Sequence, residues 1–327
     1  MSTRRRLIAV VVLVPLLAAL ALWAFAWPAA RTAPRDLPLG VAGPAAATAQ
    51  LERQLARQEG AFEIHRYADE AAARDAVEDR SVYGAIVVAP EGTELLTASA
   101  GSPVVAQLLQ ERLGRQAAVE STRLTTVDVM PAPETDPRGA ALTASVLPLA
   151  LAGIAAGAVV TLLGLRGTRA VAALVGSAVL VGLAATAVAH SWLEVIDGNW
   201  WAEAGVLGLA TLAVSAAVAG LAALLGPAGI GITAGLVMLF GNPFSGAASA
   251  PEMLPEPVGA VGQWLPPGAG AAALRSTAFF DGAAATGPAL TLTWWAALGL
   301  GAVLLGTLLK QRTESEPAAE RELASVS

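Results

Sequence analysis

The chain has 327 residues, of which 55% are hydrophobic and only 14% are charged. Soluble domains usually carry about 25% charged residues, so this composition predicts a membrane protein. The sequence has no cysteine, which excludes disulfides, thiolate metal sites and cysteine nucleophiles. A net charge of −6 without a basic stripe argues against nucleic-acid binding.

The first apolar stretch follows three arginines at positions 4–6 and extends from Leu7 to Trp27. A helix of about 20 apolar residues crosses a bilayer, so this stretch predicts the first transmembrane helix. A cleaved signal peptide is the alternative, because residues 28–30 resemble a small-residue cleavage site. The apolar run is longer than the usual core of a signal peptide, and we therefore favour an uncleaved helix.

Residues 28–138 have a different character, with many charges and short apolar runs between turn residues. Strands and helices alternate in the pattern, which predicts a small α/β domain with one mixed sheet. About 100 residues can bury a core, so this domain is expected to fold on its own. The predicted strands are 37–43, 62–67, 83–89 (the central strand), 94–100 and 122–130. Three helices are predicted between them. The first contains Leu51 and Leu55, the second covers 69–80 with Asp69 as the N-cap, and the third starts at Pro103 after Ser102.

Four apolar stretches make up the predicted membrane bundle over residues 139–312. They cover 140–165, 170–189, 204–240 and 290–309. The third is too long for one crossing and contains Gly226-Pro227, a pair that ends helices and starts turns. We interpret it as two helices, which gives six transmembrane helices in total.

Basic residues predict the orientation of the chain, because cytoplasmic flanks carry the excess of Lys and Arg. They flank the apolar stretches at residues 4–6, at Arg166 and Arg169, and at Lys310 and Arg312. Six crossings place all three groups and both termini in the cytoplasm, and the 28–138 domain outside the cell. The polar, acidic end of the chain, residues 313–327, is predicted to be a disordered tail.

The predicted spans hold essentially no ionisable residue away from their ends. A carrier driven by protons or ions usually keeps such a residue inside its bundle, so this class is disfavoured. Lys310 is the only lysine, and no Walker-type loop precedes it, so the chain does not hydrolyse ATP in that way. Glycines in two spans predict close helix packing rather than a substrate path: Gly153, Gly157, Gly299, Gly301 and Gly306.

The connector 190–201 is the most chemically varied stretch near the membrane. His190 and Glu194 would share a face of a helix, a spacing that a metal can use. No third ligand is visible, and the preferred interpretation is an interfacial cap formed with Trp192, Trp200 and Trp201. We therefore predict no metal, cofactor or catalytic residues, and no enzyme.

A long, proline-rich outer segment, residues 241–289, separates the last two spans. Irregular backbone at membrane depth survives only where protein buries it or where it lines a cavity. Residues 263–265 and 274–280 are predicted to form short helices dipping into the outer leaflet, with Arg275 and Asp281 near the headgroups. This outer segment can be interpreted either as the wall of an outer vestibule or as a structural lid. Ser245 has no neighbouring base in the sequence, which disfavours a protease.

Several stretches together resemble the ABC-2-type membrane permease family, in its YhgE/Pip-like or DUF3533-like branch. They are LPLGVAG (37–43), YGAIVVAPEG (83–92), PAPETDPRG (131–139) and the segment 242–282 with its repeated Leu-Pro rhythm. One large insert between the first two spans, followed by five clustered spans, is similar to the architecture of that family. The very short turn Arg166–Arg169 departs from the pattern, because it offers an ATPase little surface.

The resemblance implies a transport permease subunit that exports an amphipathic substrate. It also implies a separate nucleotide-binding ATPase as partner, a homo- or heterodimer in the lipid bilayer, and a location in the bacterial inner membrane. The alternative is an anchored extracytoplasmic binding or scaffolding protein without transport activity.

Overall fold

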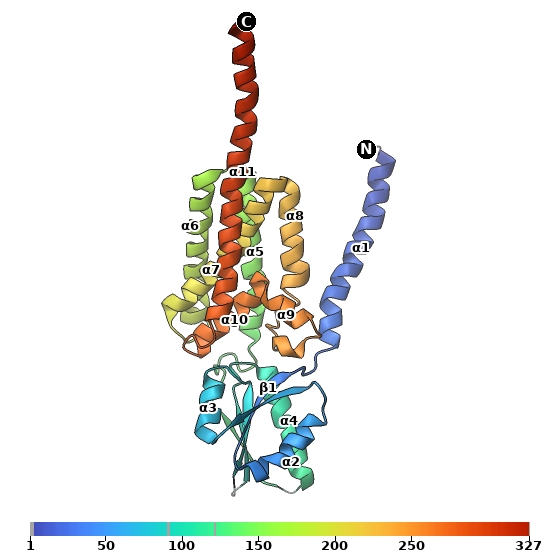
Figure 1. Ribbon diagram of the computed structural model, residues 1–327, viewed down its shortest axis with the longest axis vertical. Coiled ribbons are helices and arrows are strands. Elements are labelled where there is room, and N and C mark those ends of the chain that lie inside the picture. The colour runs from blue at the N-terminus through green and yellow to red at the C-terminus, as the bar shows by residue number, and fades with distance from the viewer. Residues whose placement is uncertain (1–2, 90–91, 121, 327) are drawn as a thin grey trace.

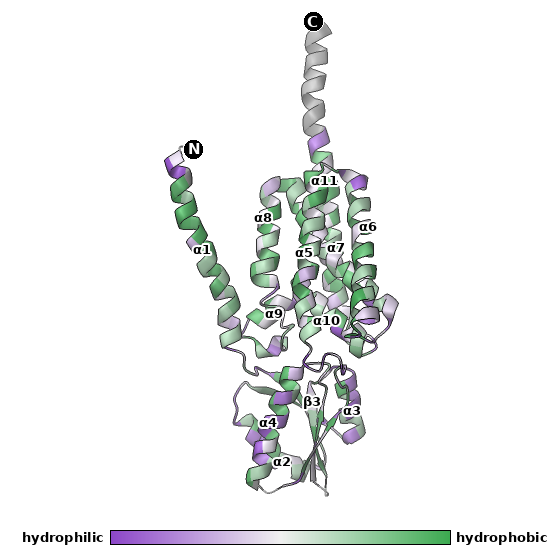
Figure 2. Ribbon diagram, turned by 180° about the vertical axis from the view of Figure 1, so that it is seen from behind, coloured by the Kyte–Doolittle hydropathy of each residue, from purple (hydrophilic) through white to green (hydrophobic). Residues whose placement is uncertain are grey.

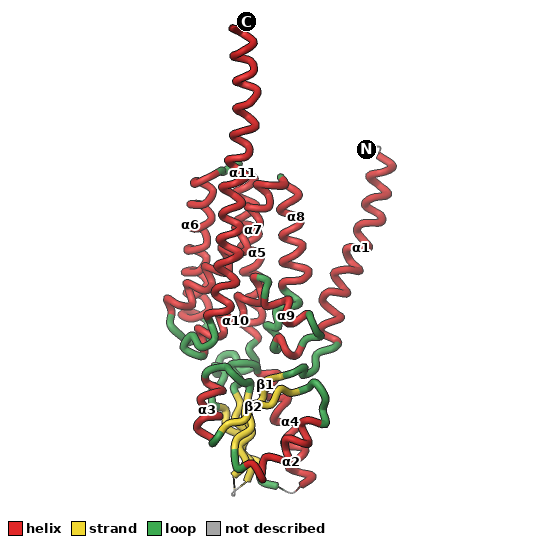
Figure 3. The backbone as a smooth tube through the Cα atoms, viewed as in Figure 1, coloured by secondary structure: helices red, strands yellow, loops and turns green. Residues whose placement is uncertain are grey.

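The computed structural model describes residues 3–89, 92–120 and 122–326 and has two parts (Figure 1). A bundle of long helices forms one part, and a small domain with a central sheet lies at one end of it. The first helix, α1 (Thr3–Ala30), stands beside the bundle and approaches it only at the end nearest the sheet domain. Loops gather where the two parts meet (Figure 3).

The sheet domain contains five strands in the order β2-β1-β3-β4-β5. β1 pairs in parallel with β2 and β3, β3 pairs antiparallel with β4, and β4 pairs in parallel with β5. The mixed sheet and the central position of β3 are as the sequence predicts. The strands are β1 (Leu37–Ala42), β2 (Phe62–Tyr67), β3 (Gly84–Ala89), β4 (Gly92–Thr97) and β5 (Leu124–Asp128).

Helices cover both faces of this sheet: α3 (Glu70–Glu78) lies on one face, with α2 (Ala45–Ala56) and α4 (Pro103–Glu120) on the other (Figure 1). The predicted caps are confirmed. The backbone N–H of Ala72 donates to Oδ1 of Asp69 at 2.9 Å. The N–H of Val105 donates to Oγ of Ser102 at 3.2 Å, and Pro103 begins α4. Each cap satisfies a donor that the first turn leaves free.

The core of the sheet domain is completed by the outer segment of the bundle. Leu39 of β1, Ile86 of β3 and Leu95 of β4 are fully buried, and Ala250 and Met253 pack into the same cluster. On the opposite face, Phe280 packs against the α3 side of the sheet. The domain therefore buries its two apolar faces partly against residues that follow it by more than 100 positions.

The bundle is organised around α7 (Trp200–Leu225), which packs against three other long helices. These are α5 (Ala140–Leu162), α6 (Gly167–Thr186, continued by the π-helical turn η1, Ala187–Trp192) and α11 (Thr286–Val326). Five helices in the described part of the chain are long and apolar enough to cross a membrane: α1, α5, α6 with η1, α7, and α11 to Gln311. The structure is therefore that of a multi-pass membrane protein.

The long apolar run does divide at Gly226, where α7 ends and α8 (Pro227–Leu236) begins. Gly226 has φ of +71°, a value that favours glycine, and α8 then turns back along the bundle (Figure 1). With the π-helical turn η2 (Val237–Gly241), α8 is only about 22 Å long, less than the hydrocarbon core of about 30 Å. A count of six full crossings therefore stays a prediction.

Both ends of the chain lie at the end of the bundle away from the sheet domain (Figure 1). Arg166 and Lys310 line one small cavity there, and the N–H of Gly167 donates to Oγ1 of Thr307 at 3.0 Å. Polar colour gathers at this end and in the sheet domain, whereas the helices between are apolar (Figure 2). Of the predicted basic flanks, the side chains of Arg6 and Arg312 lie outside the described residues. Which side of the membrane this end faces stays a prediction.

Small residues allow the close packing around α7. A Cβ atom on Gly153 would lie 2.7 Å from Cβ of Val214, and one on Gly157 would lie 2.5 Å from the carbonyl oxygen of Ser215. These contacts confirm the packing role predicted for the two glycines of α5. Gly301 differs, because a Cβ atom there would meet nothing within 4 Å.

Two segments differ from the sequence prediction. The sequence predicts a disordered tail over 313–327, whereas α11 continues as helix to Val326. The tail contains Ala, Glu, Arg and Leu, which are strong helix formers, and it extends an existing helix without a new nucleus. In the outer segment the helices are η3 (Pro251–Met253), α9 (Val258–Gln263) and α10 (Pro266–Phe279), so the helix predicted for residues 263–265 is instead the end of α9 and its junction with α10. Pro266 and Pro267 start α10 and set this boundary.

Candidate functional site

A cavity with a volume of about 570 Å³ lies between the sheet domain and the outer segment and is lined by several charged side chains. Its walls come from the start of β1, the loop between α3 and β3, and the stretch from η3 to α10. Pockets of roughly 300–1,000 Å³ with a few convergent polar groups are typical of small-molecule sites. Three arginines line this one: Arg35, Arg80 and Arg275.

Arg80 extends from the sheet domain to α10. It follows α3 in the left-handed region, with φ of 60°, which turns the chain into β3. Its Nη1 donates to the carbonyl oxygen of Ala272 at 3.1 Å and to Oγ of Ser276 at 2.5 Å. Its Cζ lies 5.2 Å from the centre of the Phe280 ring, a cation–π distance. Burial lowers the pKa of Arg80, but a guanidinium remains charged at neutral pH.

Arg275 is only 7% exposed and projects from α10. Its Nη2 donates to the carbonyl oxygen of Ala247 at 2.9 Å. Burial lowers its pKa to about 10, and the nearby Arg80 guanidinium acts in the same direction, so Arg275 stays protonated at neutral pH. The sequence places Arg275 near the outer headgroups, and this depth stays a prediction. The structure adds that α10 folds under the sheet domain and encloses the side chain.

The acidic side of the cavity is formed by Glu252 and Glu256. The hydroxyl of Tyr83 donates to Oε2 of Glu252 at 2.8 Å, which ties β3 to η3. Burial, with the neighbouring Glu252 charge, raises the pKa of Tyr83, so the phenol remains a donor. Among the described residues, neither Arg80 nor Arg275 has a carboxylate oxygen within 4.0 Å. Arg275 is therefore a buried cation and Arg80 a half-buried one, and within the described chain neither has an ion-pair partner.

Ser245 also lines the cavity, and its contacts are structural. Its hydroxyl donates to the carbonyl oxygen of Asn242 at 2.7 Å and accepts the N–H of Ala247 at 3.2 Å. Its own carbonyl oxygen accepts Nε2 of Gln263 at 2.9 Å. No histidine or carboxylate hydrogen-bonds to this hydroxyl within the described chain, and its contacts hold the loop after Asn242.

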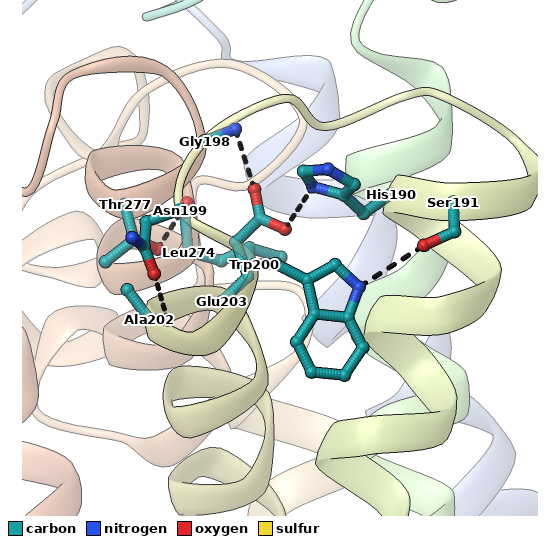
Figure 4. A network of polar contacts seen from close by, with 9 residues as sticks. All are labelled: His190, Ser191, Gly198, Asn199, Trp200, Ala202, Glu203, Leu274 and Thr277. Atoms are coloured by element: carbon teal, nitrogen blue, oxygen red, sulfur yellow. Dashed lines mark hydrogen bonds and ion pairs between the residues drawn. The ribbon is translucent and has the colours of Figure 1, made fainter.

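A second polar cluster lies where α6 ends and α7 begins (Figure 4). Nδ1 of His190 lies 2.8 Å from Oε2 of Glu203, and the N–H of Gly198 donates to Oε1 of Glu203 at 2.9 Å. Glu203 is fully buried, while Asn199 caps α7 through the N–H of Ala202. Trp200 donates its indole N–H to Oγ of Ser191 at 3.2 Å. The cluster holds the connector 190–201 against the bundle.

The helical spacing that would place His190 and Glu194 on one face does not occur. The chain leaves the helix after η1, and Glu194 takes φ of 53° with an exposed side chain. Its carbonyl oxygen instead accepts the hydroxyl of Thr135. The true partner, Glu203, is 13 positions from His190, beyond any helical spacing. Within the described residues no group of three or more His, Cys, Asp or Glu is arranged to hold a metal.

Replacement of Glu203 by alanine is expected to lower the free energy of unfolding by about 1–3 kcal/mol, because the buried Gly198 N–H and His190 lose their acceptor. Thermal unfolding of the purified protein in detergent measures the effect. Glu194→Ala in the same connector is the matched control, and it should change the melting temperature little. Equal shifts for the two variants would contradict a specific role for the buried carboxylate.

Comparison with known proteins gives one match. The profile of the family described as ABC-2 family transporter protein matches residues 5–130, which comprise α1 and the sheet domain and amount to less than half of the chain. No curated protein and no solved structure matches the chain. The match supports an ABC-2-type permease, in agreement with the resemblance that the sequence indicates. The narrower YhgE/Pip-like or DUF3533-like branch stays a prediction.

Proposed function

We propose that this chain is the transport permease subunit of an ABC-type exporter, working as a dimer in the bacterial inner membrane beside a separate ATPase. The similarity of residues 5–130 to the ABC-2 family transporter proteins carries the proposal. The substrate is proposed to be amphipathic, because the cavity at the junction combines cationic side chains with apolar walls.

The distribution of charge in the spans supports an external energy source. In the apolar parts of α5, α6, α7 and α11, the described ionisable side chains lie near the helix ends, as Arg169, Glu203 and Lys310 do. A group that changes charge inside the bundle is what ion coupling needs. A permease coupled to a nucleotide-binding subunit takes its energy from ATP and needs no such group.

The shared core supports coupling between the two parts of the chain. Ala250, Met253 and Phe280 of the outer segment belong to the cores of the sheet domain, and Arg80 is bonded to α10. A movement of the outer segment therefore carries the sheet domain with it. In the proposed cycle the bundle alternates between inward and outward openings, and the sheet domain moves as an outer gate.

The proposed ATPase contact is the basic end of the bundle. Arg169 is exposed in the first turn of α6, and Gly167, which begins that helix, links it to α11 through Thr307. If this end of the bundle contacts the ATPase, reversing the charge of Arg169 should weaken the contact. Arg169→Glu is expected to reduce co-purification of a nucleotide-binding subunit encoded by a neighbouring gene at least fivefold. Binding would be measured by affinity pull-down from detergent-solubilised membranes.

Arg138→Glu is the matched control, because Arg138 is equally exposed but lies at the sheet-domain end of the bundle. It should leave co-purification unchanged. If no nucleotide-binding subunit associates with the native chain, the permease proposal fails. Binding of an envelope component by the sheet domain, with function retained after deletion of the bundle helices, would then favour an anchored binding protein.

A further inference from the structure

Arg275 is the least satisfied charged side chain that faces the junction cavity. A guanidinium carries five N–H donors, and Arg275 has one hydrogen bond, from Nη2 to the carbonyl oxygen of Ala247. Its Nε and Nη1 have no partner among the described residues, although the side chain is 93% enclosed. Enclosing an unpaired charge is costly unless an anion compensates it.

Arg80 adds a second charge to the same cavity. Its Nη1 makes two hydrogen bonds to α10, whereas Arg275 makes one to the carbonyl oxygen of Ala247. Two guanidinium groups lining one cavity form a donor set that matches the oxygens of a carboxylate or a phosphate. Glu252 is the enclosed carboxylate on the cavity wall, and its Oε2 is already engaged by Tyr83. The arrangement leaves room and donors for one anionic group.

The bundle also contains an apolar groove. It has a volume of about 570 Å³ and is lined by residues of α7, α8 and α11 together with Trp264. Gln263 lines the cavity and the next residue, Trp264, lines the groove, so consecutive residues at the end of α9 face the two spaces. The indole N–H of Trp295 donates to the carbonyl oxygen of Trp264 at 2.8 Å, which fixes this corner. The groove lies between membrane-spanning helices and suits an acyl chain.

We propose that the junction cavity binds the anionic headgroup of an amphipathic molecule, held by Arg275 and Arg80, and that its acyl chain lies along the groove beside Trp264. This inference rests on the proposed function and names its substrate class: a single-chain amphiphile with a carboxylate or phosphate head. Glu252 faces the headgroup and weakens its binding by repulsion.

Binding of dodecyl phosphate to the full-length protein in dodecyl maltoside, at neutral pH, tests the proposal. Tryptophan fluorescence follows the titration, because Trp264, Trp294 and Trp295 line the groove. We expect saturable binding that Arg275→Gln weakens at least tenfold. Arg112→Gln is the control, because Arg112 is an exposed arginine on α4 that bonds to Gln58 far from the cavity. It should bind as the native chain does.

Glu252→Gln provides a variant of opposite sign. It keeps an oxygen for the Tyr83 hydroxyl and removes the negative charge, so it is expected to tighten dodecyl phosphate binding about threefold. This result remains decisive if Arg275→Gln fails to fold. An unchanged affinity in Glu252→Gln, or equal affinities in the native chain and a folded Arg275→Gln, would overturn the proposal.

Three further ligands distinguish the contribution of the anionic headgroup to binding from that of the acyl chain. Dodecanoate should bind in the same range as dodecyl phosphate, whereas inorganic phosphate and dodecanol should each bind at least tenfold more weakly. Inorganic phosphate binding as tightly as dodecyl phosphate would indicate a site for free anions, and equal binding of dodecanol would indicate a purely apolar site; either overturns the inference. These titrations use the chain alone, so they succeed or fail independently of ATPase co-purification.

Discussion

Replacement of Gly299 by alanine is expected to lower the free energy of unfolding of the bundle by about 3 kcal/mol. Gly299 of α11 lies directly against the backbone of α7, and a Cβ atom there would lie 2.6 Å from the carbonyl oxygen of Ala216. Backbone atoms cannot rotate away as a side chain can, so the two helices would have to separate. Because α7 is the centre of the bundle, the change would disturb its packing beyond the pair.

Thermal unfolding in detergent, followed by circular dichroism at helical wavelengths, measures this effect. Gly301→Ala is a matched control two residues along the same helix, where the added methyl group meets nothing within 4 Å. That variant should be neutral or more stable by up to about 1 kcal/mol, because alanine favours helix over glycine. If Gly299→Ala and Gly301→Ala have the same melting temperature, the close approach of α7 and α11 is wrong.

Replacement of Leu95 by alanine is expected to lower the stability of the sheet domain by about 2–5 kcal/mol. Leu95 lies in β4, is fully buried, and packs in the cluster that contains Leu39, Ile86 and Met253. Truncation removes apolar contacts and leaves a cavity in the middle of the sheet. Because Met253 belongs to the outer segment, the loss should also loosen the junction with the bundle.

Hydrogen–deuterium exchange of the full-length protein measures this loss locally. Amides of β3 and β4 should exchange at least about 30-fold faster in Leu95→Ala, the factor that corresponds to about 2 kcal/mol when exchange follows local stability. Val119→Ala on α4 is the control, because its side chain is 86% exposed and buries nothing. Similar protection in native and Leu95→Ala proteins would show that Leu95 is not part of the core.

Local signals in the sequence identify the elements of the sheet domain. β2 matches its predicted range, and Asp69 and Ser102 cap the helices that they precede in the sequence. Each of these features depends on residues within a few positions of one another, which is why a single sequence is enough to predict them. The independent core predicted for residues 28–138 needs a correction, because Ala250, Met253 and Phe280 complete it.

The candidate site depends on contacts that no local pattern contains. Arg80 and Arg275 are 195 positions apart and face one cavity only because α10 folds beneath the sheet domain. Glu203 pairs with His190 across the end of α6, at a separation of 13 positions that no helical spacing predicts. One signal was present: Arg275 is an arginine within an apolar stretch, and such a residue needs a buried partner or a ligand.

The sequence by itself determined that the chain is a membrane protein with a mixed α/β insert, that a glycine-proline pair divides its longest apolar run, and that basic residues gather at one end. These properties follow from composition, periodicity and turn chemistry, which act over one or two helical turns. Only the tertiary structure decided that the outer segment completes the core of the insert and encloses two arginines. A side chain is buried only when distant segments of the chain pack against each other. The free energy of that packing comes from side chains far apart in the sequence, so no local pattern predicts it.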